Sequence, residues 1–183
     1  LHLAMLAAGL GAGDEVITTP VTFVASANCV LYAGATPRFA DISDSDLGLD
    51  HSKARKAVTV RTRGLIPVHF GGMPNAWGKK ADYSKKKDFV VVEDACHALG
   101  AEIRRGAKRE RIGACTDTDM AVFSFHPVKH VTTGEGGMVT TRRKNLYEKL
   151  RLLRSHGIVR EPARFARPEN AGSPWYYEMA DLG

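Results

Sequence analysis

Short apolar runs alternate with helix-like stretches along most of this chain. Six apolar runs predict strands, at residues 15–19, 37–41, 64–69, 89–93, 120–125 and 137–141. Five stretches between and beside them predict helices, at residues 1–10, 24–32, 50–58, 75–87 and 143–155. Strands that alternate with helices favour an α/β fold, in which a mainly parallel sheet is flanked by helices.

The predicted helices differ in how regular they are. Asp50 is expected to cap the helix that follows it, because an aspartate side chain accepts hydrogen bonds from the first free amides. The helix at 143–155 has one apolar face, formed by Leu146, Leu150 and Leu153. The helix at 75–87 is poorly amphipathic and carries Gly78 at its centre. Residues 156–183 are rich in proline, arginine and glycine, and we expect a loop there.

The composition fits one ordered domain spanning residues 1–183. The chain is 44% hydrophobic and 25% charged, which is enough apolar material for a core. Its net charge of +6 comes mainly from two clusters: Lys79, Lys80, Lys85, Lys86 and Lys87, and Arg104, Arg105, Lys108, Arg109 and Arg111. No aromatic residues interleave with these clusters, so solvated surfaces on a helix and a hairpin loop are favoured over nucleic-acid binding.

The cysteines and the apolar runs exclude several classes of protein. Cys29, Cys96 and Cys115 are odd in number and lack metal-type spacing, which argues against a disulfide framework and against a metal site. A reducing, cytoplasmic location fits. No apolar run has the length of a membrane span, so we expect no membrane segment.

Two groups with acid–base chemistry follow predicted strands. Asp94 comes directly after the strand at 89–93, and Lys129 lies between the strand at 120–125 and a glycine-rich turn. Sites in parallel sheets lie beyond the carboxyl ends of the strands, so we expect both groups in one site. A lysine amine can form an imine with an aldehyde, and a carboxylate can hold a pyridine nitrogen protonated. This pair indicates pyridoxal 5′-phosphate (PLP) chemistry.

Seven segments carry a family pattern in the same order along the chain, at residues 13–20, 22–28, 34–37, 93–100, 124–137, 154–158 and 174–179. Together they resemble the DegT/DnrJ/EryC1/StrS family of PLP-dependent sugar aminotransferases. The resemblance implies the large domain of a PLP-dependent transferase of fold type I. It also implies a homodimer for the full-length form, with the family's small C-terminal domain absent from this sequence.

The resemblance assigns roles to individual residues. Lys129 would bind PLP covalently and then move a proton between substrate and cofactor, and Asp94 would pair with the pyridine nitrogen. His97 would contact the cofactor ring or its hydroxyl, and Ser124 the phosphate. Phe23 would stack on the ring.

Simpler interpretations stay open for three of these residues. His97 could be a core histidine, Phe23 a core aromatic, and Ser124 a residue with one backbone hydrogen bond. In the family's sugar dehydratases a histidine replaces the lysine. Here Lys129 is present and His130 follows it, which favours transamination.

Within the family, residues 126–129, 155–157 and 175–177 most resemble the branch of pseudaminic acid biosynthesis. This implies transfer of an amino group from glutamate to C4 of a UDP-linked 4-keto-6-deoxy amino sugar. The family's Gly-Thr-Ser and Asn-Tyr-Arg phosphate segments are not in the sequence, so we expect a longer enzyme around this chain. The alternative is a non-catalytic fragment. Lys80 also departs from the pattern, because the family buries an aliphatic side chain there.

Overall fold

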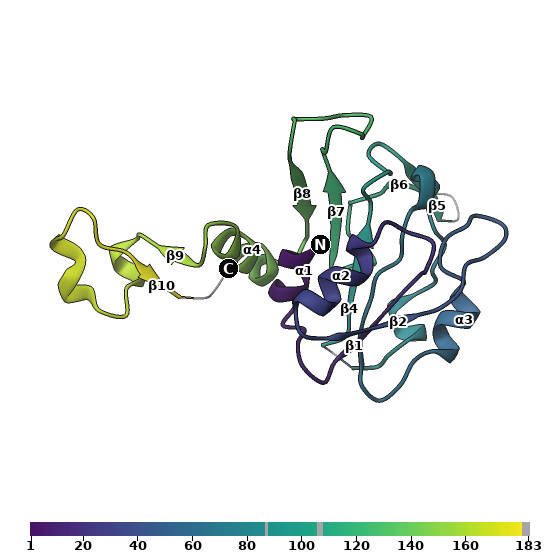
Figure 1. The fold of residues 1–183 in the computed structure, drawn as a ribbon, viewed down its shortest axis with the longest axis horizontal. Helices are drawn as coiled ribbons and strands as arrows, with labels where there is room; N and C mark the ends of the chain where they lie inside the picture. Colours follow the sequence, from purple (N-terminus) through teal and green to yellow (C-terminus); the bar gives the residue numbers. More distant parts are fainter. Residues whose placement is uncertain (87, 106–107, 181–183) are drawn as a thin grey trace.

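A six-stranded sheet forms the centre of the computed structural model, which describes residues 1–86, 88–105 and 108–180 (Figure 1). The strand order is β2-β1-β3-β4-β7-β8, formed by β1 (Glu15–Thr18), β2 (Thr36–Phe39), β3 (Thr62–Leu65), β4 (Val90–Asp94), β7 (Met120–Ser124) and β8 (Gly137–Thr140). Within the described part of this sheet, only the β7–β8 pair is antiparallel. The predicted, mainly parallel α/β sheet is therefore confirmed.

Helices cover both faces of this sheet. Three of them, α1 (His2–Ala7), α2 (Ala25–Tyr32) and α4 (Lys144–Arg154), pack on one face. There Met5, Val30 and Leu146 join Val90 and Val92 of β4 in one buried cluster. The opposite face is covered by α3 (His51–Lys56) and by residues 75–89. Both faces are therefore buried, which explains the continuous valine run of β4.

The predicted helix at 75–87 is wrong. The described part of this segment has one 3-10 turn, η2 (Lys80–Asp82), and its aromatic side chains Trp77 and Tyr83 are buried in the core beneath α3. Gly78 has a φ of +92°, and a Cβ there would lie 2.5 Å from the His51 ring. A helix would move these side chains off the core, so packing overrides the weak helical pattern.

Lys80 does not disturb the packing of this segment. Its Nζ lies 2.9 Å from a carboxylate oxygen of Asp119, a residue that is 6% exposed. The aliphatic contact expected from the family pattern is replaced by an ion pair.

The limits of several elements differ from the expected ones. The first helix ends at Ala7, and the chain turns at Gly9 with a φ of +70°. The cap at Asp50 is confirmed, since its carboxylate accepts a 2.8 Å hydrogen bond from the Lys53 amide. The third strand ends at Leu65 and continues only as a single bridge between Val68 and Asp94, before the 3-10 turn η1 (Phe70–Gly72).

The second basic cluster forms a hairpin, β5 (Glu102–Arg105) and β6 (Lys108–Arg111), as expected. Residues 106 and 107, which come between these strands in the sequence, lie outside the described residues, as does Lys87 of the first cluster. The first cluster was expected on an α-helix. Its described residues lie instead in the segment at 75–87, which has the 3-10 turn η2 and no α-helix among its described residues.

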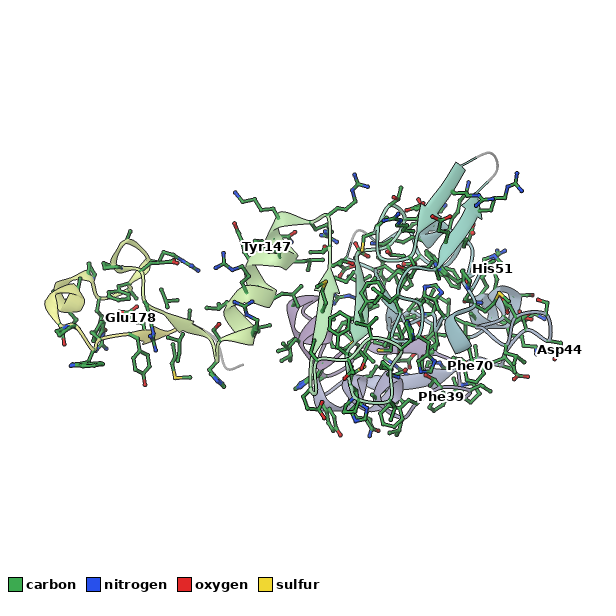
Figure 2. All side chains as sticks on the ribbon, turned by 90° about the horizontal axis from the view of Figure 1, so that it is seen from above. Phe39, Asp44, His51, Phe70, Tyr147 and Glu178 are labelled. Atoms are coloured by element: carbon green, nitrogen blue, oxygen red, sulfur yellow. The ribbon has the colours of Figure 1, made fainter. Side chains whose placement is uncertain are left out.

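The C-terminal region is more ordered than the predicted loop. It contains β9 (Ile158–Val159), paired antiparallel with β10 (Glu178–Met179), and the 3-10 turns η3 (Pro162–Arg164) and η4 (Pro168–Gly172). The Glu178 carboxylate accepts hydrogen bonds from the amides of Ala166 and Arg167 and from the Tyr176 hydroxyl. We call residues 156–180 the C-terminal arm. It extends beyond α4, away from the sheet (Figure 1). In Figure 2, Glu178 is labelled in the arm and Tyr147 in α4. Across the described ranges, no helix has the length and apolar character that crossing a membrane requires.

Candidate active site

The ends of β4 and β7 bring the predicted polar residues to one edge of the sheet. Asp94 is paired in register with Val122, and side chains two residues apart in a strand share a face. Asp94 and Ser124 therefore lie on the face that α2 covers. Lys129 lies in the loop that joins β7 to β8, and its amide donates a 2.9 Å hydrogen bond to the His126 carbonyl.

Asp94 is a buried carboxylate held from two sides. It is 5% exposed. One oxygen accepts a 2.6 Å hydrogen bond from the Ser26 hydroxyl of α2, and the other accepts a 3.2 Å bond from the Cys96 amide. No lysine or arginine in the described part of the chain forms an ion pair with Asp94. A carboxylate has about four acceptor positions, so it retains capacity for one more donor.

This arrangement fits PLP. Burying a carboxylate without a cation is costly unless a further positive or hydrogen-bonding group approaches it. The protonated nitrogen of a pyridine ring is such a group. Asp94 can therefore hold the ring of PLP through its nitrogen, while Ser26 and the Cys96 amide keep the carboxylate in place.

Lys129 lies close enough to His97 and Cys96 to affect their ionisation. Partial desolvation, and after it the Lys129 ammonium, lowers the pKa of His97 below its ordinary value, whereas the Asp94 carboxylate opposes this shift. Burial, and after it the Asp94 carboxylate, raises the pKa of the Cys96 thiol to about 12, and Lys129 opposes that shift. Lys129 and Asp94 thus act electrostatically on the same two side chains.

Three further predicted residues have exposed or half-buried side chains. Phe23, just before α2, is 76% exposed, and His97 is also exposed, so the interpretation of either as a core residue is wrong. Ser124 is half-buried, and its hydroxyl oxygen accepts a 3.3 Å hydrogen bond from the His126 amide. That contact leaves the hydroxyl proton free to be donated elsewhere, for example to a phosphate.

Sequence reasoning missed the role of Ser26. The residue belongs to one of the family segments, but nothing in its spacing connects it with Asp94, 68 positions away. Ser26 is 0% exposed, and its hydroxyl also lies 2.8 Å from that of Thr22. A serine on the buried face of an otherwise small and apolar helix was the available signal.

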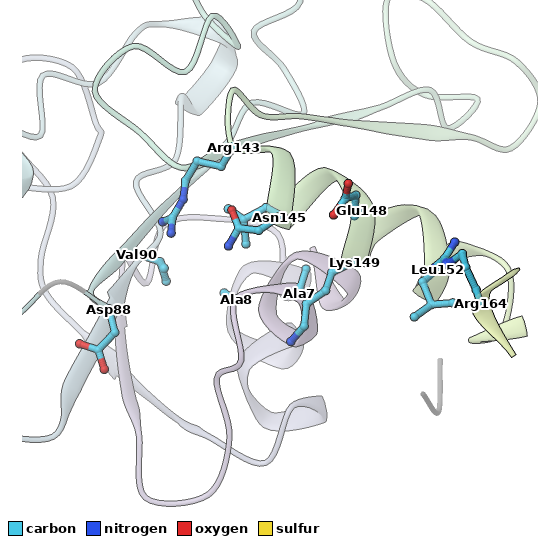
Figure 3. A pocket seen from close by; sticks show the side chains of 11 residues that line it. Ala7, Ala8, Asp88, Val90, Arg143, Asn145, Glu148, Lys149, Leu152 and Arg164 are labelled. Atoms are coloured by element: carbon cyan, nitrogen blue, oxygen red, sulfur yellow. The ribbon is translucent and has the colours of Figure 1, made fainter. Parts of the chain in front are cut away.

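The structure also contains a cavity of about 450 Å³ between α1, β4 and α4 (Figure 3). It is lined by Ala7, Val90, Arg143 and Leu152, among others, and by none of the predicted site residues. This cavity is separate from the candidate site. In the described ranges, no group of histidine, cysteine and acidic side chains could hold a metal ion.

Two known proteins match this chain over most or all of its length. The spore coat polysaccharide biosynthesis protein SpsC of Bacillus subtilis is 42% identical over 183 residues, which is 100% of this chain and 45% of SpsC. GDP-perosamine synthase of Caulobacter vibrioides is 42% identical over 158 residues, which is 86% of this chain and 41% of that protein. The chain thus spans less than half the length of these relatives.

Solved structures are similar over the whole chain. An aminotransferase from Psychrobacter cryohalolentis has a TM-score of 0.83 at 32% identity, covering 100% of this chain and 44% of that one. The PLP form of Spr1654 from Streptococcus pneumoniae has a TM-score of 0.77 at 29% identity, covering 99% and 47%. These likenesses confirm the predicted fold, the large domain of a fold type I PLP-dependent transferase.

The family model for the DegT/DnrJ/EryC1/StrS aminotransferase family matches residues 1–182. The match spans all the strands of the sheet, the helices around it and the loop that carries Lys129. The chain therefore belongs to the DegT/DnrJ/EryC1/StrS aminotransferase family, whose aminotransferases depend on PLP.

Proposed function

We propose that residues 1–183 are the PLP-binding large domain, or most of it, of a nucleotide-sugar aminotransferase. The proposed reaction moves an amino group from glutamate to C4 of a UDP-linked 4-keto-6-deoxy amino sugar, as in pseudaminic acid biosynthesis. The observation that carries the proposal is the buried Asp94 carboxylate, which has hydrogen bonds but no cationic partner among the described residues. Lys129 would supply the amine, and its ammonium acts electrostatically on Cys96 and His97, as Asp94 does.

Bound PLP would supply an aldehyde that takes up the amino group and a ring that accepts electrons from the substrate carbon. Lys129 holds the cofactor through its Nζ and, once released, uses the same atom to carry a proton to and from the substrate carbon. Asp94 accepts a hydrogen bond from the ring nitrogen and keeps it protonated. The lowered pKa of His97 favours its neutral form, which can donate one hydrogen bond at the ring while carrying no charge.

Two residues are proposed to hold the rest of the cofactor. Ser124 donates its hydroxyl proton to the phosphate, and Phe23 covers one face of the ring. The exposure of Phe23 leaves its aromatic face accessible to such a ring.

A second copy of the chain is the proposed macromolecular partner. Phe23 and Val24 beside the site are 76% and 56% exposed, and Val128 and Val131 in the lysine loop are 78% and 51% exposed. Apolar side chains gathered around a site favour an interface between subunits. The proposed compartment is the cytoplasm, in keeping with three cysteines that are free.

The proposal is tested by adding PLP to the purified protein and recording its visible spectrum, then supplying glutamate and a 4-keto sugar nucleotide. The expected result is a band of lysine-bound PLP that disappears with glutamate and returns with the keto sugar. UDP-linked and GDP-linked sugars are compared side by side, because one relative is named for a GDP-linked product. Equal or better use of the GDP sugar would contradict the UDP assignment.

The second candidate is a non-catalytic fragment of such an enzyme. The observation that favours it is that the chain spans 45% of SpsC. A protein that gives no PLP band at any concentration, although it is folded by circular dichroism, would support this candidate over the enzyme.

A further inference from the structure

A second pair of titratable side chains lies directly behind Asp94. Glu93 precedes it in β4, so its side chain points to the opposite face of the sheet. Glu93 is 5% exposed and His69 is 1% exposed. The His69 Nε2 lies 3.6 Å from one oxygen of Glu93, and the Thr118 hydroxyl lies 3.4 Å from the other.

The hydrogen bonds of His69 define which ring nitrogen carries a proton. Its Nδ1 accepts a 3.0 Å hydrogen bond from the Asn75 amide, so this nitrogen has no proton of its own. The neutral ring then carries its proton on Nε2, facing Glu93. Among the described residues Nε2 makes no hydrogen bond, and the Glu93 oxygen that it faces lies 3.6 Å away. His69 thus joins the carboxylate of β4 to the backbone of the loop at 69–75.

This loop contacts the backbone of two proposed cofactor-binding residues. The His69 amide donates a 3.1 Å hydrogen bond to the Asp94 carbonyl. The Gly72 amide donates a 3.0 Å bond to the His69 carbonyl, and a Cβ on Gly72 would lie 2.7 Å from the His97 carbonyl oxygen. Gly72 has a φ of +87°, which favours glycine. The loop thus packs against Asp94 and His97 from behind.

Stability alone does not account for a buried histidine and glutamate at this place. Replacing both members of a buried polar pair by well-packed apolar residues is often nearly neutral or stabilising, because both groups lose their hydration on burial. A polar pair that links the strand of Asp94 to the loop behind His97 does have a geometric effect. The His69–Glu93 pair fixes the distance between β4, which carries Asp94, and the loop at 69–75, which packs behind His97.

We propose that His69 and Glu93 are positioning residues that hold Asp94 and His97 in the geometry that binds PLP. Neither touches the cofactor; they act through the loop at 69–75. This inference rests on the proposed function, since it takes Asp94 and His97 as cofactor-binding residues.

The test measures the dissociation constant for PLP and the visible spectrum of bound PLP in purified variants. Leucine at either position removes the link, and His69→Leu or Glu93→Leu is expected to weaken PLP binding about tenfold and to shift the band. His69→Asn keeps an acceptor near the Nδ1 position for the Asn75 amide, and Glu93→Gln keeps an acceptor for Nε2. Glu93→Gln should recover most of the affinity that Glu93→Leu loses. His69→Asn restores the contact with Asn75 but does not reach Glu93, so it should recover only part of what His69→Leu loses.

Should a leucine variant fail to fold, His69→Gln takes its place. Its side chain reaches Glu93 but offers no acceptor at the Nδ1 position, and the same tenfold loss is expected. The matched control is His51→Leu, which removes a histidine whose Nδ1 lies 2.7 Å from the Tyr83 hydroxyl beneath α3. This control should lower the unfolding temperature and leave PLP binding unchanged.

Two outcomes would overturn the inference: folded His69→Leu, Glu93→Leu or His69→Gln variants with parental PLP affinity and spectrum, or Glu93→Gln and His69→Asn variants no better than their leucine counterparts. Asp94→Asn separates this failure from that of the proposed function. If Asp94→Asn changes PLP binding and the His69 and Glu93 variants do not, only the positioning role is wrong. If Asp94→Asn also has no effect, the cofactor assignment itself is wrong.

Discussion

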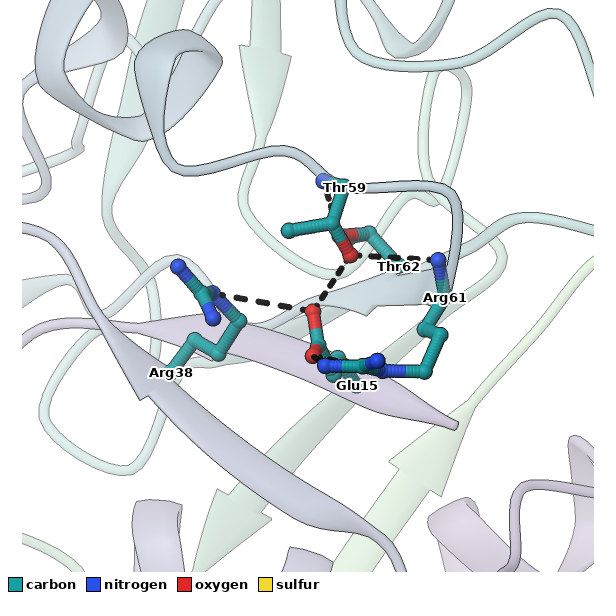
Figure 4. A network of polar contacts seen from close by, with 5 residues as sticks. All are labelled: Glu15, Arg38, Thr59, Arg61 and Thr62. Atoms are coloured by element: carbon teal, nitrogen blue, oxygen red, sulfur yellow. Dashed lines mark hydrogen bonds and ion pairs between the residues drawn. The ribbon is translucent and has the colours of Figure 1, made fainter. Parts of the chain in front are cut away.

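Buried carboxylates have different partners at the two ends of the central sheet. At the amino end, Glu15 begins β1 and is reached by the guanidinium groups of Arg61 at 2.6 Å and Arg38 at 3.6 Å, and by the Thr59 hydroxyl (Figure 4). Asp119, just before β7, pairs with Lys80 and Arg143. At the carboxyl end, Asp94 has a hydroxyl and an amide but, among the described residues, no lysine or arginine.

We interpret this difference as one between structural carboxylates and the proposed cofactor-binding carboxylate. Buried carboxylates that only stabilise a fold are satisfied by the chain's own cations. A buried carboxylate that is held in position yet left without a cation has acceptor capacity for a ligand. In a parallel sheet the carboxyl end is also where ligands bind. All three carboxylates are buried. Among the described residues, Asp94 differs from Glu15 and Asp119 because no lysine or arginine pairs with it.

The largest effect is expected from Lys129→Ala, which removes the proposed proton carrier at the carboxyl end. Amino transfer from glutamate should fall by roughly 10⁴-fold, and the band of lysine-bound PLP should disappear. The measurement is turnover together with the visible spectrum. His130→Ala, in the same exposed loop, is the control and should keep both. Retained turnover in Lys129→Ala would remove this lysine from the mechanism.

Asp94→Asn should lower turnover by about 10³-fold, because an amide does not hold a pyridine nitrogen protonated. The same change should leave the unfolding free energy within about 1 kcal/mol of the parent, since no ion pair among the described residues is broken. Turnover and urea unfolding are measured on the same samples. A large loss of stability with normal turnover would show that Asp94 stabilises the fold and does not take part in the reaction.

Asp119→Asn is expected to do the opposite of Asp94→Asn: it should lower stability and leave PLP binding unchanged. It leaves Lys80 and Arg143 without their shared carboxylate, and it weakens the 2.8 Å hydrogen bond that Asp119 accepts from the Val91 amide. We expect a loss of about 3 kcal/mol of unfolding free energy, by urea denaturation. PLP affinity of the folded fraction should not change. A variant that is as stable as the parent would show that cation pairing at the amino end has little structural effect.

Glu15→Gln should destabilise the fold by about 2 kcal/mol at neutral pH. The Thr59 hydroxyl, and after it the Arg61 guanidinium, holds the pKa of Glu15 below its ordinary value, against the effect of burial. A lowered folded-state pKa adds stability above the unfolded-state pKa of about 4.3, and this stability is lost as the pH falls through the folded-state value. The difference between parent and variant should therefore shrink in acid. Unfolding curves from pH 7 to pH 3 measure it; a constant difference would contradict the assignment.

The smallest effect is expected from Ser26→Ala, which removes one donor from Asp94 and leaves the Cys96 amide. PLP affinity should weaken by about tenfold, because the carboxylate is held less firmly. Isothermal titration with PLP measures this, and Ser45→Ala in an exposed loop is the control. Unchanged affinity would mean that the amide alone positions Asp94.

The sequence predicted the central strands well because β1, β4 and β7 are short, largely apolar and buried on both faces. It also predicted that Asp94, Ser124 and Lys129 lie at strand ends, since side-chain alternation and strand direction follow from local pattern. It failed at residues 75–87, where Trp77 and Tyr83 pack into the core instead of following a helical period. It failed again at the C-terminal arm, where β9 and β10 pair across about 20 residues.

By itself, therefore, the sequence determined the α/β architecture, the family and the chemical groups available at the strand ends, because these depend on residues close together in the chain. Only the tertiary structure decided which carboxylates are paired. Ser26 reaches Asp94 across 68 positions, and Arg61 reaches Glu15 across 46. Such partners are set by the packing of α2 and of the loops on the sheet, and no local pattern encodes them.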